Sequence, residues 1–279
     1  MFVSQSHMKT AARPKVSWVQ LRSDLKKAEA TLKLTGSLPN FFREQVSVAQ
    51  AKEEIKTALG SRRERFLEMA RVQIYEVPTS PYLRLLRFAG CGFSDLRDYV
   101  YRHGLEEALT KLATEGVYLT SEEYKGKKEI RRGSLSFRVS PSDFELSTAP
   151  AGMFINSSGT KNKPVSTLAP LDWLALRAPS VAVFSVAHEL FSHSHALYDA
   201  ILPASSIQHL LVNARIGIKT ARWFARGIPV NSNIEGLYHW SATHLIVWMG
   251  KRFGPGFPTP EFVDIGDVQI GRASCRERV

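Results

Sequence analysis

The spacing of apolar residues changes at about Gly116, and this change limits the chain to a fold that mixes helices with strands. Before this point, apolar residues recur at three- and four-residue steps, as over residues 17–34, which is the period of one helix face. After it, short apolar runs and alternating patterns, as over 135–139, are typical of strands. The sequence therefore predicts an α/β protein with a helical N-terminal region.

Local signals predict where the helices begin and end. The expected helices cover residues 17–34, 41–59, 61–74, 82–89, 94–102, 105–114 and 171–187. Gly36 is expected to end the first helix and Gly90 the fourth, because glycine is the common residue just after a helix. Ser80 and Pro81 are expected to begin the fourth, as N-cap and first helical residue.

Two capping boxes are expected, one at Ser61 with Glu64 and one at Thr120 with Glu123. The expected strands cover residues 117–119, 135–139 and 153–156. Residues 125–133, rich in lysine and arginine, are expected to form a loop.

These patterns divide the chain into three parts. Residues 1–75 are expected to form the helical region and residues 76–270 a mixed α/β domain. Residues 271–279 resemble the translation of a vector or adapter, and we expect a foreign tail that follows a truncation at about Ile270. The tail contains three arginines and one glutamate, so it contributes +2 of the formal net charge of +11.

The composition excludes several classes of protein. No segment approaches 18 uninterrupted apolar residues, and the polar start from Met1 to Val16 lacks the apolar core of a secretory signal. Cys91 and Cys275 are too few for a disulfide framework or a four-thiolate zinc site. We therefore expect a cytoplasmic protein with no membrane span.

The positive charge does not predict a nucleic-acid partner. Its clusters, at Arg62-Arg63, 125–128 and Arg131-Arg132, are scattered rather than arranged in one stripe, and no nucleic-acid-binding motif accompanies them. We expect solvated basic faces, and the alternative is that these clusters attract ATP, CoA or an acidic carrier.

The segment 153–164 is expected to bind phosphate. Its apolar start runs directly into small hydroxyl residues, a glycine and lysines. Gly159 permits a backbone turn that aims successive N–H groups at an anion. The hydroxyl donors and positive charges come from Ser157, Ser158, Thr160, Lys161 and Lys163. The segment has neither the Walker-type nor the dinucleotide-binding glycine pattern.

This loop resembles the signature loop of the adenylate-forming superfamily, which reads Ser-Ser-Gly-Thr-Thr-Gly-Lys-Pro in the phenylacetate-CoA ligase branch. Six of its eight positions match in order, at Ser157, Ser158, Gly159, Thr160, Lys163 and Pro164. Lys161 stands where the family has a second hydroxyl residue, and Asn162 where it has its second glycine. A weaker resemblance covers about residues 75–270, and the chain is also similar to acyl-protein synthetases of the same superfamily.

The resemblance implies ATP-dependent activation of a carboxylic acid to an acyl-adenylate, followed by transfer of the acyl group to a thiol of CoA or of a protein. The loop would bind the β- and γ-phosphates of ATP, with Mg²⁺ at the reacting centre. The family's aromatic-Gly-x-Thr-Glu motif, its ribose-binding aspartate and its C-terminal lysine have no match in this sequence. The resemblance thus implies that the chain is the truncated start of such a domain. It assigns no catalytic residue, and the chain is not expected to complete the reaction.

Two other groups of residues suggest chemistry less strongly. His188, His193 and His195 lie close together in the sequence but lack the i, i+4 spacing of a helical zinc site, so we expect no metal site. Cys91 lies between two glycines and is expected to be a small buried residue at a turn.

An alternative function is that of a non-catalytic basic interaction protein, with residues 17–75 as a helical module for a partner. In that case Trp18, Phe41 and Phe42 are expected to be exposed. If the helices instead belong to the fold, these aromatic side chains are expected to be buried.

Overall fold

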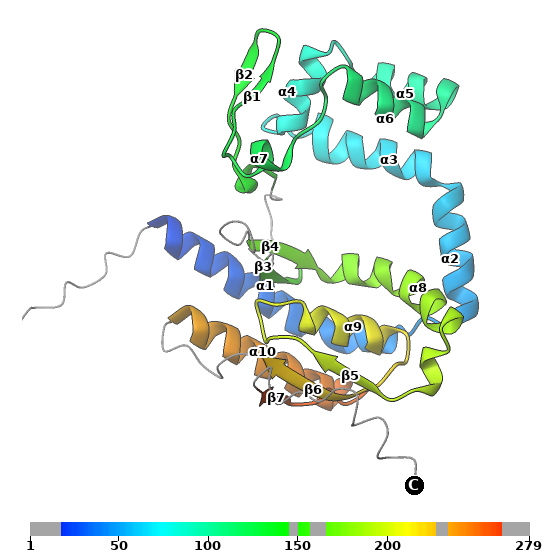
Figure 1. Ribbon diagram of the computed structural model, residues 1–279, viewed down its shortest axis with the longest axis vertical. Helices are drawn as coiled ribbons and strands as arrows, with labels where there is room; N and C mark the ends of the chain where they lie inside the picture. Colours follow the sequence, from blue (N-terminus) through cyan, green and yellow to red (C-terminus); the bar gives the residue numbers. More distant parts are fainter. Residues whose placement is uncertain (1–17, 145–149, 157–165, 227–233, 264–279) are drawn as a thin grey trace, which may run out of the picture.

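The structure is a computed structural model that describes residues 18–144, 150–156, 166–226 and 234–263. Figure 1 shows two lobes joined by the helix α2 (Val48–Gly60). We call them the helical lobe, residues 62–144, and the sheet lobe, which contains the helix α1 (Trp18–Arg43) and the described residues from 150 to 263. The expected α/β class with a helical N-terminal region is confirmed.

The helical lobe is built from short helices and one small hairpin. Its elements are α3 (Arg62–Ala70), a π-helical turn η1 (Arg71–Tyr75), α4 (Pro81–Phe88), α5 (Phe93–His103), α6 (Leu105–Thr114), α7 (Ser121–Tyr124), β1 (Ile130–Arg132), β2 (Leu135–Phe137) and a 3₁₀ turn η2 (Pro141–Phe144). The strands β1 and β2 pair antiparallel. Two separate clusters of buried apolar residues stabilise the lobe, one around Leu67 and Val100 and one around Leu85 and Ile130.

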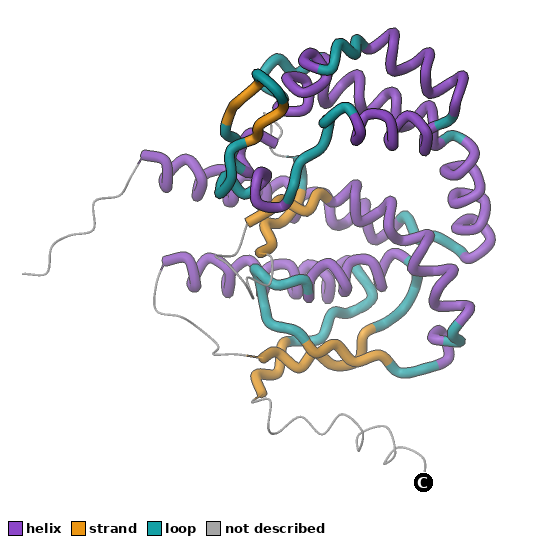
Figure 2. The backbone as a smooth tube through the Cα atoms, turned by 45° about the horizontal axis from the view of Figure 1, so that its top comes forward, coloured by secondary structure: helices purple, strands orange, loops and turns teal. Residues whose placement is uncertain are grey.

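The sheet lobe contains an antiparallel hairpin and a parallel sheet. Besides α1, its elements are β3 (Gly152–Asn156), β4 (Ser166–Pro170), α8 (Leu171–Ala187), a 3₁₀ turn η3 (Leu190–Ser192), β5 (His195–Tyr198), α9 (Ser206–Arg215), β6 (Thr220–Arg226), α10 (Ile234–Phe253) and β7 (Pro260–Val263). The strands β5, β6 and β7 are parallel neighbours in that order. Figure 2 shows this sheet as an outer layer, with the helices of the lobe on one side of it.

One large hydrophobic core holds the sheet lobe together. It includes Leu34, Phe41 and Phe42 of α1 together with Trp223 of β6 and Ile246 of α10. In three dimensions the first helix therefore belongs to the sheet lobe. The domain boundaries expected at residues 75 and 270 stay predictions, and residues 271–279 lie outside the described part of the chain.

Several predicted helix boundaries are confirmed, namely those of 105–114 and 171–187, as well as the start at Pro81 after Ser80. The end predicted at Gly36 is wrong, because α1 continues to Arg43. Its last turns bury Leu38, Phe41 and Phe42 in the core, and burial of such side chains outweighs the local cost of a helical glycine.

The capping box predicted at Ser61 is also wrong. Ser61 makes no side-chain cap, and its hydroxyl donates back to the carbonyl of Thr57 at 2.8 Å. A capping box instead joins Ser47 and Gln50 at the start of α2. The box predicted at Thr120 and Glu123 is confirmed.

The predicted strand over 117–119 does not form. The carbonyls of Gly116 and Tyr118 instead accept hydrogen bonds from the guanidinium of Arg132, both at 2.9 Å. A side chain thus replaces the neighbouring strand as hydrogen-bond partner. Arg132 itself belongs to β1, a strand inside the segment predicted to be a loop.

None of the helices in the described ranges is both long and apolar enough to cross a bilayer.

Candidate functional site

The hairpin of β3 and β4 carries the segment expected to bind phosphate. The two strands pair in antiparallel register from Gly152 with Pro170 to Asn156 with Ser166, which confirms the predicted strand before the loop. The expected site residues Ser157, Ser158, Gly159, Thr160, Lys161 and Lys163 lie outside the described residues. Their flanking residues are direct cross-strand partners, so the two ends of the segment lie next to each other.

The local sequence explains why this hairpin packs tightly on the core. Met153 and Ala169 form a cross-strand pair and are 1% and 3% exposed. At Gly152 a Cβ atom would lie 2.6 Å from the carbonyl oxygen of Ala169, so only glycine permits this close approach. The strand β4 then leads directly into α8, which begins at Leu171.

A long-range hydrogen bond fixes the end of β3. The N–H of Asn156 donates to the carbonyl oxygen of Pro203 at 2.8 Å. Pro203 lies in the loop 199–205, which follows β5 at the carboxyl edge of the parallel sheet. Ligands of open α/β sheets bind in this region, outside the carboxyl ends of the strands. The residue that precedes the expected phosphate loop is therefore attached to the edge where a ligand would bind.

The loop 199–205 is held in place by its own first residue. The Asp199 carboxylate accepts hydrogen bonds from the N–H of Ala200 at 2.9 Å and from the hydroxyl of Ser205 at 2.8 Å. The N–H of Asp199 donates to the carbonyl of Phe224 in β6 at 3.2 Å. Both oxygens of the carboxylate thus have donors within the protein, and the loop is braced between β5 and α9.

The helix α10 supports the same loop from the core side. The N–H of Leu202 donates to the hydroxyl of Thr243 at 3.2 Å, and this hydroxyl donates to the carbonyl of His239 at 2.7 Å. Thr243 is completely buried. Burial also lowers the pKa of His239, so the imidazole beneath the loop is neutral at pH 7.

One exposed cation lies at this edge among the described residues. Arg226 is the last residue of β6; its side chain is 59% exposed and its Nη2 lies 3.7 Å from Oδ1 of Asp199. Arg222, four residues earlier on the same strand, is instead paired closely with Glu261 of β7 at 2.6 Å. The guanidinium of Arg226 therefore remains accessible to an anionic ligand.

The three histidines do not converge on one point. The ring of His188 lies against that of Phe184 in a tilted arrangement. His193 hydrogen-bonds to the carbonyl of Glu189 at 2.9 Å, and His195 to that of Leu190 at 2.7 Å. In His193 and in His195, one ring nitrogen is therefore held by a main-chain carbonyl. In the described part of the chain, no group of three or more potential metal ligands is found.

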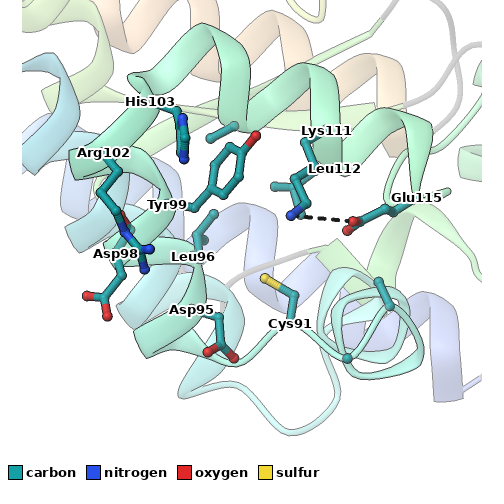
Figure 3. Close-up of a pocket in the computed structure, with 13 residues that line it drawn as sticks. Cys91, Asp95, Leu96, Asp98, Tyr99, Arg102, His103, Lys111, Leu112 and Glu115 are labelled. Atoms are coloured by element: carbon teal, nitrogen blue, oxygen red, sulfur yellow. Dashed lines mark hydrogen bonds and ion pairs between the residues drawn. The ribbon is translucent and has the colours of Figure 1, made fainter.

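Cys91 lies in a polar pocket of about 360 Å³ in the helical lobe. Figure 3 shows its sulfur between Asp95 and the ion pair of Lys111 with Glu115, while Tyr99 lies further along the wall. Burial raises the pKa of the Cys91 thiol, which therefore stays protonated and weakly nucleophilic at pH 7. The sequence predicts a small buried residue at a turn, whereas the structure leaves Cys91 only partly buried.

Sequence reasoning missed Asp199, Pro203 and Arg226. A signal exists for the first two, because both follow the apolar strand segment Leu197-Tyr198. Nothing local indicates that this segment is the edge strand of a parallel sheet, since its partner β6 is distant in the sequence.

No family model, curated protein or solved structure matches this chain.

Proposed function

We propose that this chain binds ATP at the loop between β3 and β4, as the start of an adenylate-forming domain that activates a carboxylic acid for transfer to a thiol. One observation carries the proposal, the hydrogen bond of 2.8 Å from the N–H of Asn156 to the carbonyl of Pro203. It attaches the strand that leads into the Ser-Ser-Gly-Thr segment to the carboxyl edge of the parallel sheet. Both the residue pattern and its position in the fold then favour the same kind of ligand.

In this proposal the segment supplies three kinds of contact to the phosphates. Gly159 permits the backbone turn, and Lys161 and Lys163 provide positive charge. The hydroxyl donors are Ser157, Ser158 and Thr160. Arg226, the exposed cation at the sheet edge, adds a charge from β6. Together these groups stabilise the negative charge of the triphosphate and orient it for attack by a carboxylate.

The described residues do not form a Mg²⁺ site of their own at this edge. Asp199 is the carboxylate there, and its oxygens already accept hydrogen bonds from Ala200 and Ser205. Mg²⁺ is commonly held by substrate phosphates with one or two carboxylates. We therefore expect the ion to enter with the nucleotide.

The acceptor in this proposed function is a thiol, either of CoA or of a carrier protein, as the family resemblance implies. Because the later motifs of the superfamily have no match in this sequence, we expect the chain to bind ATP without turning it over.

The burial of two aromatic residues argues against the alternative, a basic module that binds a partner through its first helices. Phe41 and Phe42 are each 6% exposed and pack in the core of the sheet lobe. Phe42 lies edge-to-face on Phe257, with ring centres 5.5 Å apart. The side chain of Trp18 lies outside the described part of the molecule. The alternative assigns three aromatic residues to a partner surface, and two of them are therefore buried in the core instead.

ATP binding by purified protein tests the proposal. Equilibrium dialysis with MgATP should show saturable binding that the double substitution Gly159→Ala and Lys163→Ala weakens by about tenfold or more, because it removes both the backbone turn and a charge. A matched control is Lys128→Ala, which removes the same charge from the basic segment of the helical lobe and should leave binding unchanged.

Two outcomes would contradict the proposal. Equal weakening by Lys128→Ala would indicate non-specific attraction by net charge, as the basic interaction protein predicts. Absence of saturable binding by the parent protein would remove the nucleotide site.

A further inference from the structure

The helical lobe contains a cavity of about 680 Å³ that the proposed nucleotide site does not use. This volume is within the range of small-molecule sites. Its walls come from α3, η1, α4, α5 and α6, together with Val117 and the turn at Phe144. Most of the lining is apolar.

The cavity separates the two hydrophobic clusters of this lobe. On one side it is lined by Phe66 and Leu112, which pack on the cluster around Leu67. On the other side it is lined by Tyr82 and Phe144, which pack on the cluster around Leu85 and have ring centres 6.2 Å apart. Protein interiors are normally packed without such gaps. An apolar molecule in this space would join the two clusters into one core.

The entrance to the cavity exposes large apolar side chains. Met69 is 39% exposed and Leu109 is 45% exposed, and both line the cavity. Water therefore contacts apolar surface here, at a free-energy cost that an apolar ligand would relieve.

The charge of the lining limits the kind of ligand. Among the described residues that line the cavity, none is a lysine, arginine or histidine, whereas Asp143 contributes a carboxylate. Burial raises the pKa of Tyr82, so its hydroxyl stays neutral. Arg71, in the adjacent π-helical turn, is paired with Glu68 at 2.7 Å and with Glu76. A carboxylate ligand would therefore find repulsion and no counter-ion.

The backbone of the wall is itself unusual. Residues Arg71–Tyr75 form a π-helical turn, and Gln73 and Ile74 of this turn line the cavity. π-Helical turns are rare and are frequent at functional sites. Gln73, Thr79 and Ser80 add polar groups to a wall that is otherwise apolar, which is the usual composition of a small-molecule site.

We propose that this cavity is a binding site for a small uncharged apolar molecule, such as a medium-chain alcohol or an aromatic hydrocarbon, distinct from the nucleotide site. Three observations support this proposal together. They are the volume of the cavity, its position between the two hydrophobic clusters, and the lack of a positively charged side chain among the described lining residues. The site does not take the carboxylic acid of the proposed reaction, because its lining disfavours anions.

A fluorescence titration of the full chain with N-phenyl-1-naphthylamine, a neutral apolar dye, tests this proposal. We expect saturable enhancement at one site per chain, reversed by 1-decanol. At pH 8, decanoate should compete about tenfold less well than 1-decanol, because its charge must be buried without a partner. Asp143→Asn should narrow this difference by removing the repulsion.

A substitution that fills the entrance separates this site from other apolar surfaces. Leu109→Trp should weaken dye binding by about tenfold, since the larger ring occupies the cavity. Leu32→Trp is the matched control, because Leu32 is 74% exposed on α1 in the other lobe. Equal binding by parent and Leu109→Trp, equal competition by alcohol and acid, or no saturable binding would each overturn the proposal. Lys163→Ala should leave dye binding unchanged, so the two proposals can fail separately.

Discussion

The indole N–H of Trp223 donates a hydrogen bond to the main-chain carbonyl of Asp199 at 2.8 Å. Trp223 is completely buried at the centre of β6, and Asp199 is the first residue after β5. A core side chain therefore fixes the start of the loop whose Pro203 carbonyl holds the end of β3. The position of the candidate site depends in this way on the packing of the parallel sheet.

Trp223→Phe should lower the free energy of unfolding by about 3 kcal/mol, because it leaves a cavity and removes the donor for the Asp199 carbonyl. Urea unfolding followed by circular dichroism measures this change. Trp248→Phe is the control, because Trp248 is 56% exposed and its replacement should change stability by less than about 0.5 kcal/mol. Similar losses for both variants would contradict the structural role assigned to Trp223.

Arg226→Ala should weaken MgATP binding by about three- to tenfold, since the guanidinium is the accessible cation at the carboxyl edge. Arg222→Ala is a matched control on the same strand, with similar exposure, 54% against 59%. Arg222 is paired with Glu261, so its loss should leave the affinity unchanged. If both variants bind equally, Arg226 does not contact the nucleotide.

Glu123→Gln should destabilise the protein by about 2–3 kcal/mol at pH 6 and by much less at pH 2. The hydrogen bonds from Arg132, at 3.0 Å and 3.3 Å, are the main reason that the pKa of Glu123 is lowered to about 2. A lowered pKa in the folded state adds stability that is present above the ordinary pKa of 4.5. This stability is lost as the pH falls through the folded value.

Unfolding of the parent and of Glu123→Gln should therefore converge between pH 4.5 and pH 2, as measured by denaturant midpoints at each pH. Glu122→Gln changes an exposed neighbour in the same short helix and serves as the control. A difference between parent and Glu123→Gln that stays constant with pH would show that the carboxylate charge is not responsible.

Two glycine substitutions should have opposite effects on stability. Gly250→Ala should destabilise the protein by about 1–3 kcal/mol, because the added Cβ would lie 2.2 Å from the ring of Phe257. Gly36→Ala, in the interior of α1 with no atom near the added methyl, should stabilise it by about 0.5–1 kcal/mol. Thermal unfolding of the two variants beside the parent provides the measurement, and the same sign for both would contradict this packing.

The parts of the fold that depend on neighbours in the sequence were predictable. The helix 105–114 is amphipathic, the helix from Pro81 begins with a residue suited to that position, and the capping box of Thr120 and Glu123 closes within one turn. Each of these signals concerns residues three or four positions apart. Hydrogen bonds and side-chain contacts over this distance are determined by the local backbone alone.

The boundaries that tertiary contacts decide were not predictable in the same way. α1 passes Gly36 because its later residues are buried against distant parts of the chain. Residues 117–119 form no strand because the side chain of Arg132 takes the hydrogen bonds that a strand would have made. In both cases a long-range partner changes which local conformation has the lower free energy.

The candidate site shows the same division. The sequence by itself determined the chemistry of the expected phosphate loop, since hydroxyl groups, a glycine and lysines follow an apolar strand whatever the rest of the chain does. Only the tertiary structure decided that Asn156 meets Pro203 and that Asp199 and Arg226 lie at the same edge. Asn156 and Arg226 end strands, and Asp199 and Pro203 lie in the loop after β5. The arrangement of these strands depends on the burial of Trp223 and its neighbours in a shared core, which no local pattern encodes.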